Sequence, residues 1–167
     1  MKCHVVLTLL GDDQPGLVHA MADLVTNHGG NWLESRMANM AGQFAGLARI
    51  ECEEQTVGEL MHSLRESLPS MTFFHHQTLA LQHDDLKEYQ LEVLGLDRKG
   101  IVREMTAAIA RAGGNIESLE TRLESAPMTG QWMFRAQVIL SVPEAISPSA
   151  VRMAIESLGG DLTVEMD

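Results

Sequence analysis

The spacing of apolar residues changes along the chain, and the changes outline its elements. A β-branched, apolar run from Cys3 to Leu10 suits a buried strand. Beyond Gly16 the apolar residues recur at the spacing of one helix face. These residues are Leu17, Met21, Leu24 and Val25. The Gly29–Gly30 pair then predicts the end of that helix, because glycine adopts a left-handed C-cap at little cost.

A hairpin and a second helix follow in the same half. The chain is expected to turn near Ala41–Gly42 and to return as a strand from about Gln43 to Cys52. Thr56-x-x-Glu59 has the pattern of a capping box and predicts a helix start. The residues expected to face inward from this helix are Val57, Leu60, Met61 and Leu64. A last strand is expected near 71–81.

The second half of the chain repeats the first. The segment LLGDDQPGLV at 9–18 returns as VLGLDRKGIV at 93–102. Eight residues recur at one constant offset of 84, so the repeat needs no gap over this stretch. They are Gly11, Asp13, Gly16, Leu17, Val18, Gly29, Gly30 and Asn31, repeated as Gly95, Asp97, Gly100, Ile101, Val102, Gly113, Gly114 and Asn115.

The second copy predicts the same elements with a longer hairpin loop. Its first helix carries the apolar stripe Ile101, Met105, Ala108 and Ile109. The hairpin is expected to turn around Pro127 to Gly130 and to return over 131–142. Ser147–Pro148 predicts the start of the last helix, since proline suits the first helical position. Its inward residues would be Val151, Ala154, Ile155 and Leu158, and a final strand is expected near 161–166.

The predicted order is therefore β-α-β-β-α-β, twice. Such a split βαβ unit is ferredoxin-like, an α+β fold with two helices on one face of a four-stranded antiparallel sheet. We expect two modules, 1–83 and 84–167, joined by a short linker near His83 to Lys87. A module of about 80 residues buries only a modest core, so docking of the two modules would add stability.

Charge and composition narrow the possible partners. Of 167 residues, 45% are hydrophobic, with no basic leader and no apolar run of spanning length, so a cytoplasmic protein is expected. The net charge is −11, with −6 up to Asp84 and −5 beyond it. A protein that grips phosphates needs a basic face. Direct binding of nucleic acid or of an anionic membrane is therefore not expected.

The repeated loop is the main candidate for binding chemistry. It lies before a helix, where unpaired amides and the positive end of the helix dipole favour a carboxylate. Gly16 and Gly100 leave room for a ligand to approach those amides. Asp13 and Asp97 could cap the helix or accept a hydrogen bond from a ligand ammonium.

Two further features of the loops leave alternatives open. Asn31 and Asn115 would add amide groups to a site if their strands begin beside the loop. The first loop carries uncharged Gln14–Pro15 where the second carries cationic Arg98–Lys99, so one loop could bind while the other is structural. A tight turn with an N-cap would also explain the glycine and the aspartate without any ligand.

Other chemistry finds little support in the sequence. The loops lack the Lys-Ser/Thr of a P-loop, and no GxSxG elbow occurs, so neither a nucleotide cofactor nor a catalytic residue is expected. His75 and His76 would face opposite sides of a strand, which argues against a metal site. Cys3 and Cys52, the only cysteines, are expected to be two buried thiols, with a disulfide as the minor alternative.

The paired D-x-x-G-[LI]-V loops and G-G-N segments resemble those of tandem ACT domains. The layout, without an attached catalytic or DNA-binding domain, is similar to the glycine cleavage system transcriptional repressor family. The resemblance implies a non-enzymatic regulator of transcription that binds a small amino acid, with glycine the first candidate, between two modules. It implies as ligand-binding residues Asp13, Gln14, Pro15, Gly16, Leu17, Asn31, Asp97, Arg98, Lys99, Gly100, Ile101 and Asn115.

The same resemblance implies a protein partner. Members of that family act by contact with a DNA-binding regulator of the glycine cleavage genes, and they need no cofactor. Exposed strand edges could also pair between chains, which would give a homo-oligomer. The alternative to a ligand-responsive regulator is an oligomerisation or interaction module that binds no ligand.

Overall fold

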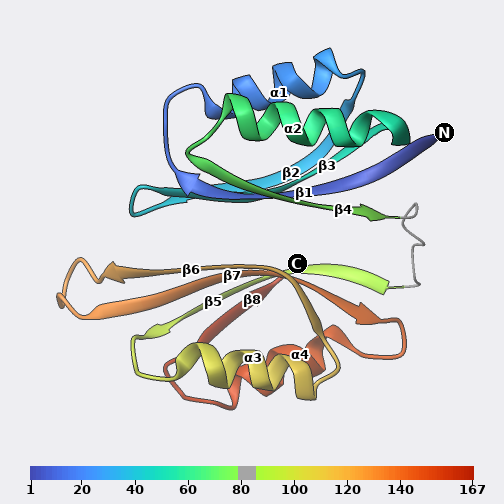
Figure 1. Cartoon of the computed structure of the whole chain (residues 1–167). Helices are drawn as coiled ribbons and strands as arrows, with labels where there is room; N and C mark the ends of the chain where they lie inside the picture. Colours follow the sequence, from blue (N-terminus) through green and yellow to red (C-terminus); the bar gives the residue numbers. More distant parts are fainter. Residues whose placement is uncertain (79–85) are drawn as a thin grey trace. The chain divides into compact units, whose positions relative to one another are not determined.

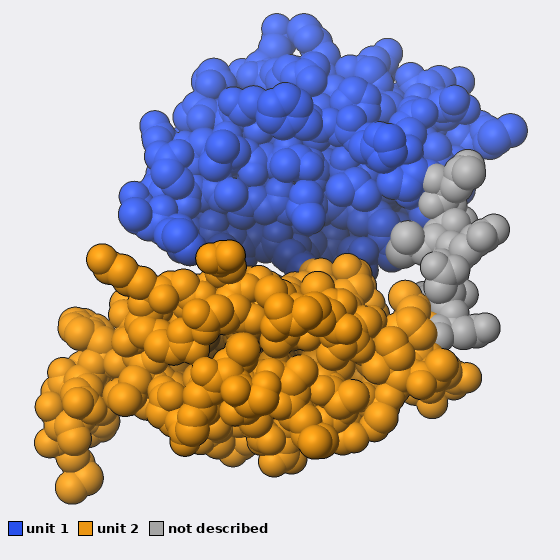
Figure 2. Space-filling view, turned by 90° about the horizontal axis from the view of Figure 1, so that it is seen from below, with its two compact units in different colours: residues 1–82 blue, residues 83–167 orange. Residues whose placement is uncertain are grey.

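The computed structural model describes residues 1–78 and 86–167. The chain divides into two compact units, Met1–Gln82 and His83–Asp167, coloured separately in Figure 2. Residues 83–85 of the expected linker lie outside the described part, and Leu86 and Lys87 already belong to a strand. Each unit has its own hydrophobic core and is described by itself.

Unit 1 is a four-stranded antiparallel sheet with two helices on one face (Figure 1). Its elements are β1 (Lys2–Asp12), α1 (Leu17–Asn27), β2 (Asn31–Met40), β3 (Gln43–Glu53), the 3-10 turn η1 (Glu54–Thr56), α2 (Val57–Ser67) and β4 (Met71–Thr78). The strand order is β2-β3-β1-β4. The last predicted strand thus begins at the expected residue, while 79–81 lie outside the described residues.

Unit 2 repeats this topology. Its elements are β5 (Leu86–Leu96), α3 (Ile101–Arg111), β6 (Asn115–Ser125), β7 (Trp132–Pro143), α4 (Pro148–Glu156) and β8 (Thr163–Met166), in the sheet order β6-β7-β5-β8. The predicted α+β fold of two ferredoxin-like modules is confirmed. Its hairpin turns through 126–131, whereas the first hairpin turns tightly at Ala41–Gly42.

The helix-facing side of each sheet carries the core that the apolar spacing predicts. Val5, Leu7 and Leu9 alternate along β1 and are almost fully buried. They meet the buried stripe of α1, in which Leu24 alone is partly exposed. Burying a side chain of this size stabilises the fold by about 1.5–3 kcal/mol relative to leaving it in water. Packing of amphipathic helices, rather than helix propensity, therefore fixes the layers.

Both predicted helix ends at Gly-Gly pairs are confirmed, and α2 starts at Val57 as predicted but without the predicted capping box. Gly29 has a φ of 71°, and the amide of Gly30 donates to the carbonyl of Val25 at 2.8 Å. The capping box at Thr56 does not form, because its hydroxyl donates back to the carbonyl of Glu53 at 2.8 Å. Helix α2 begins from the turn η1 instead. Among the described residues, no helix is long and apolar enough to cross a membrane.

Candidate ligand-binding loops

The loop before each first helix is a type II turn. Gly16 has φ 82° and ψ 3°, and Gly100 has φ 87° and ψ 1°, a conformation that disfavours any residue with a Cβ. The amide of Leu17 donates to the carbonyl of Gln14 at 3.3 Å, and that of Ile101 donates to Arg98 at 3.3 Å. The sequence thus places glycine where the turn requires it.

Two amides remain without a partner at each of these helix starts. The first bond of the α-helical type runs from the amide of Ala20 to the carbonyl of Gly16 in α1, at 2.9 Å. In α3 the equivalent bond joins Glu104 to Gly100 at 3.0 Å. Among the described residues the amides just before these donors, at 18–19 and 102–103, find no acceptor. Such amides at the positive end of a helix favour an anion.

The aspartates do not cap the helices, which corrects that part of the sequence-based expectation. Neither Gly16 nor Gly100 is accompanied by a side-chain cap. Asp13 instead accepts a hydrogen bond from the side chain of Asn39, and its amide donates to Gly42 at 3.0 Å. It thereby ties the first loop to the β2–β3 turn. No spacing rule on the sequence signals this contact, because Asn39 belongs to a neighbouring hairpin.

The second loop borders a hollow of about 380 Å³. It is lined by Asp97, Arg98, Gly100, Ile101, Val102, Thr121, Arg122, Leu123 and Phe134. The loop and the start of α3 form one wall, and strands β6 and β7 supply the other. Lys99 is exposed but is not part of the lining. Four of the predicted site residues of the second half thus meet around one space.

The hollow offers charges of both signs close together. The Arg98 guanidinium pairs with Glu104 at 2.5 Å, and Arg122 pairs with Glu124 at 2.6 Å. Asp97 is exposed, and its carboxylate has no partner among the described residues. A zwitterion could therefore place its carboxylate near Arg98 and its ammonium near Asp97. The first loop, with Gln14 and Pro15, supplies no cation of its own.

The asparagines lie far from the loop of their own unit. Asn31 pairs with Glu51 on β3, whereas Asp12, at the loop, pairs with Gln43 on the same strand. Eight residues of strand separate these positions, or about 26 Å at 3.3 Å per residue. In unit 2, Asn115 pairs with Ser141 and donates to Glu117 at 2.7 Å. A ligand in either loop is thus out of reach of the asparagine of the same unit.

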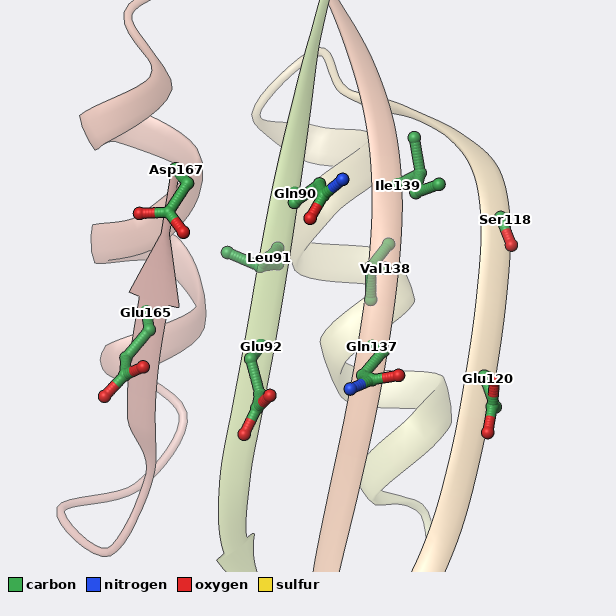
Figure 3. A pocket seen from close by; sticks show the side chains of 10 residues that line it. All are labelled: Gln90, Leu91, Glu92, Ser118, Glu120, Gln137, Val138, Ile139, Glu165 and Asp167. Atoms are coloured by element: carbon green, nitrogen blue, oxygen red, sulfur yellow. The ribbon is translucent and has the colours of Figure 1, made fainter.

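A second hollow, of about 340 Å³, lies on the helix-free face of the unit 2 sheet (Figure 3). Side chains from β5, β6, β7 and β8 line it, among them the carboxylates of Glu92, Glu120, Glu165 and Asp167. Only Glu92 has a cationic partner among the described residues, in Arg135. The sequence signal for this face is the polar residue at every second strand position, as at Gln90 and Glu92 on β5. The carboxylates make it a poor site for an anion.

The matching face of unit 1 is more apolar. Leu10 and Leu47 are about half exposed, and Phe74 is 63% exposed. Thr8 pairs with both Leu47 on β3 and Phe74 on β4, so the two apolar side chains flank it on one sheet face. The helix-free faces of the two units therefore differ in chemistry although the fold is the same.

Residues 3–81 match the family model of the ACT domain. The match falls on unit 1, and the chain as a whole has a tandem ACT-like fold of two modules. A solved structure of an unknown protein from Galdieria sulphuraria is 27% identical, with a TM-score of 0.87 over 100% of this chain and 98% of that one.

A second solved structure, described as a "putative glycine cleavage system transcriptional repressor", is 19% identical. Its TM-score is 0.70 over 100% of this chain and 97% of that one, which confirms the fold that the resemblance implied. No protein of curated function matches the sequence.

Proposed function

We propose that this chain is a regulatory protein without catalytic activity that senses a small amino acid and passes the signal to a DNA-binding transcriptional regulator by protein contact. Glycine is the first candidate ligand, and control of glycine cleavage genes is the candidate role. The observation that carries the proposal is the hollow beside Gly100, which is lined by the start of α3, by Arg98 and by Asp97.

The chemistry of that hollow matches a small zwitterion. The two unpaired amides and Arg98 suit a carboxylate, while Asp97 suits an ammonium. The hollow is lined on one side by Leu123 and Phe134, which offer an apolar wall to the carbon atoms of the ligand. The first loop has the same backbone but no cation, so we assign ligand binding to unit 2.

The charge of the chain supports a protein partner over nucleic acid. The net charge of −11 opposes approach to a phosphate backbone. A ligand can change the affinity of the chain for its partner only if it binds two arrangements of the protein with different affinities. The partner must then change the affinity for the ligand by the same factor. Mixing the chain with duplex DNA at low salt is expected to give no complex without a second protein.

The first test is thermal unfolding of the purified chain against a panel of amino acids that includes glycine and serine. A ligand at about 100 times its dissociation constant adds about 2.7 kcal/mol of stability. If unit 2 unfolds by itself, that corresponds to a rise in its Tm of roughly 10 °C or more, and if the whole chain unfolds together, to roughly 5–10 °C. A rise with one amino acid would support the proposal, and no rise with any would contradict ligand sensing by the chain alone.

A matched pair of variants assigns the site. Gly16→Ala and Gly100→Ala place a Cβ at nearly the same φ, 82° and 87°, with no heavy atom within 3.4 Å of either Cβ. Both should cost about 1–2 kcal/mol of backbone strain. Only Gly100→Ala should also weaken amino-acid binding. If both variants weakened amino-acid binding equally, or if only Gly16→Ala weakened it, the assignment of the site to the second loop would be wrong.

A second candidate function is an interaction module that binds no ligand. The exposed Leu10, Leu47 and Phe74 favour it, since apolar side chains gathered on one sheet face are typical of protein contacts. Replacing Phe74 by serine should then abolish partner binding while no amino acid changes stability. A ligand response that survives Phe74→Ser would favour the sensing role.

A further inference from the structure

The two cysteines, distant in sequence, lie directly opposite each other in the sheet. Cys3 on β1 pairs with Cys52 on β3 in the antiparallel register. The amide of Glu54 donates to the carbonyl of Met1 at 2.9 Å, so these two opposed residues form a hydrogen-bonded pair. Such pairs recur at every second position of an antiparallel ladder, so Cys3 and Cys52 also form a hydrogen-bonded pair. The Cα atoms of such a pair lie about 5.5 Å apart. That separation falls inside the range of roughly 4.4–6.8 Å found for disulfides.

Both side chains also point to the same side. Cys3 shares the helix-facing alternation of Val5 and packs against the unit 1 core, and Cys52 is 2% exposed within that core. Both thiols are free in this structure. Directly opposed side chains on one face are close enough for a bond between their ends.

The two thiols differ in their access to solvent. Cys3 is partly exposed, so a small oxidant can reach it, whereas Cys52 is buried. Burial, followed by the neighbouring Cys3 thiol, raises the pKa of the Cys52 thiol. Cys52 is therefore less readily deprotonated than a free thiol, and it is shielded from solvent.

We propose that Cys3 and Cys52 form a reversible redox site that closes to a disulfide when hydrogen peroxide oxidises the protein. The Cys3 sulfur attacks one peroxide oxygen, the O–O bond breaks, and Cys3 becomes a sulfenic acid as one water leaves. The Cys52 sulfur then attacks the Cys3 sulfur, the S–O bond breaks, and the second water leaves with the Cys52 proton. The thiols lose two electrons and two protons in all, and the hydrogen peroxide is reduced.

The test treats the reduced full chain with hydrogen peroxide, denatures it, adds N-ethylmaleimide and measures the intact mass. Because the sequence holds only two cysteines, an intramolecular disulfide must join Cys3 to Cys52. We expect a monomer lighter by two hydrogen atoms that takes up no maleimide, and full restoration of both reactive thiols by dithiothreitol. Added oxygen on Cys3 with Cys52 still open to maleimide, or disulfide only between chains, would overturn the proposal.

Two variants test whether the disulfide forms because of the strand register or only because the two thiols are close in the fold. Cys3→Ser should leave one maleimide-reactive thiol after oxidation and show no loss of hydrogen. The double variant Glu51→Cys, Cys52→Ala moves the thiol by one residue and so to the other face of β3. It should lose the intramolecular bond while keeping two cysteines. Bond formation at wild-type rate in that variant would show that the native register is not what joins the thiols.

Discussion

The tight turn of unit 1 places Ala41 in a left-handed backbone conformation that alanine rarely adopts. Ala41 has a φ of 52°, and the following Gly42 has a φ of 84°. Two positive φ values in a two-residue hairpin loop are typical of a type I′ turn, which favours Asn-Gly. The same turn contacts the candidate loop of unit 1, because the carbonyl of Gly42 accepts a bond from Asp13.

Ala41→Asn is therefore expected to stabilise unit 1 by about 1 kcal/mol, since asparagine tolerates the left-handed region better than alanine. Gly42→Ala, in the same turn, should destabilise it by about 1–2 kcal/mol. A Cβ at Gly42 would meet no heavy atom within 4 Å, so the loss would report backbone strain alone. Urea unfolding of the two variants measures both effects, and a shift of the same sign in both would contradict the assignment of the strain.

Strands and helices were the part of the molecule that could be predicted best from the sequence. Periodicity gave the stripe of α1 and the buried alternation of β1, because those patterns depend only on local geometry. The sequence left open whether Cys3 and Cys52 meet and whether Asn31 lies beside its loop. Strand register and strand length, not sequence distance, decide which residues face each other, and neither can be read from one strand alone.

On the open face of the unit 2 sheet, an arginine of the central strand β7 binds carboxylates from the two neighbouring strands. Arg135 on β7 pairs with Glu92 on β5, and its Nε donates to both oxygens of Glu124 on β6 at 3.2 Å. The Arg135 side chain is only 24% exposed, so this network is less screened by water than an ordinary surface pair.

Arg135→Met should lower the stability of unit 2 by about 1–3 kcal/mol, because it leaves two carboxylates without their shared donor. Arg152→Met is the matched control, since it breaks an exposed pair with Glu156 on one helix and should cost at most about 0.5 kcal/mol. Adding Glu92→Gln to Arg135→Met should recover part of the loss. Equal losses for the two arginine variants would show that the network contributes no more than a surface pair.

At the scale of the whole molecule, a duplicated fold has been given two different surfaces. The cores are built alike, with Met21 in α1 and Met105 in α3 at equivalent and fully buried positions. Of the two loops, only that of unit 2 carries cationic side chains, Arg98 and Lys99. Exposed apolar side chains lie on the open sheet face of unit 1. Division of labour between a sensing unit and a partner-binding unit would explain why both copies are kept.

Such a division requires that each unit can unfold without the other. Tryptophan fluorescence can measure the unfolding of each unit, because each contains one of the two tryptophans. Trp32 lies in β2 of unit 1 and Trp132 in β7 of unit 2, so a Phe substitution of either leaves a reporter for the other unit. Met21→Ala should lower the stability seen by Trp32 by about 2–5 kcal/mol, and Met105→Ala should do the same for Trp132. If the units have independent cores, each variant leaves the other unit's urea midpoint unchanged. A common shift of both midpoints would instead mean that the chain unfolds as one cooperative body, and the signal from a ligand in unit 2 would then reach unit 1 through their shared stability.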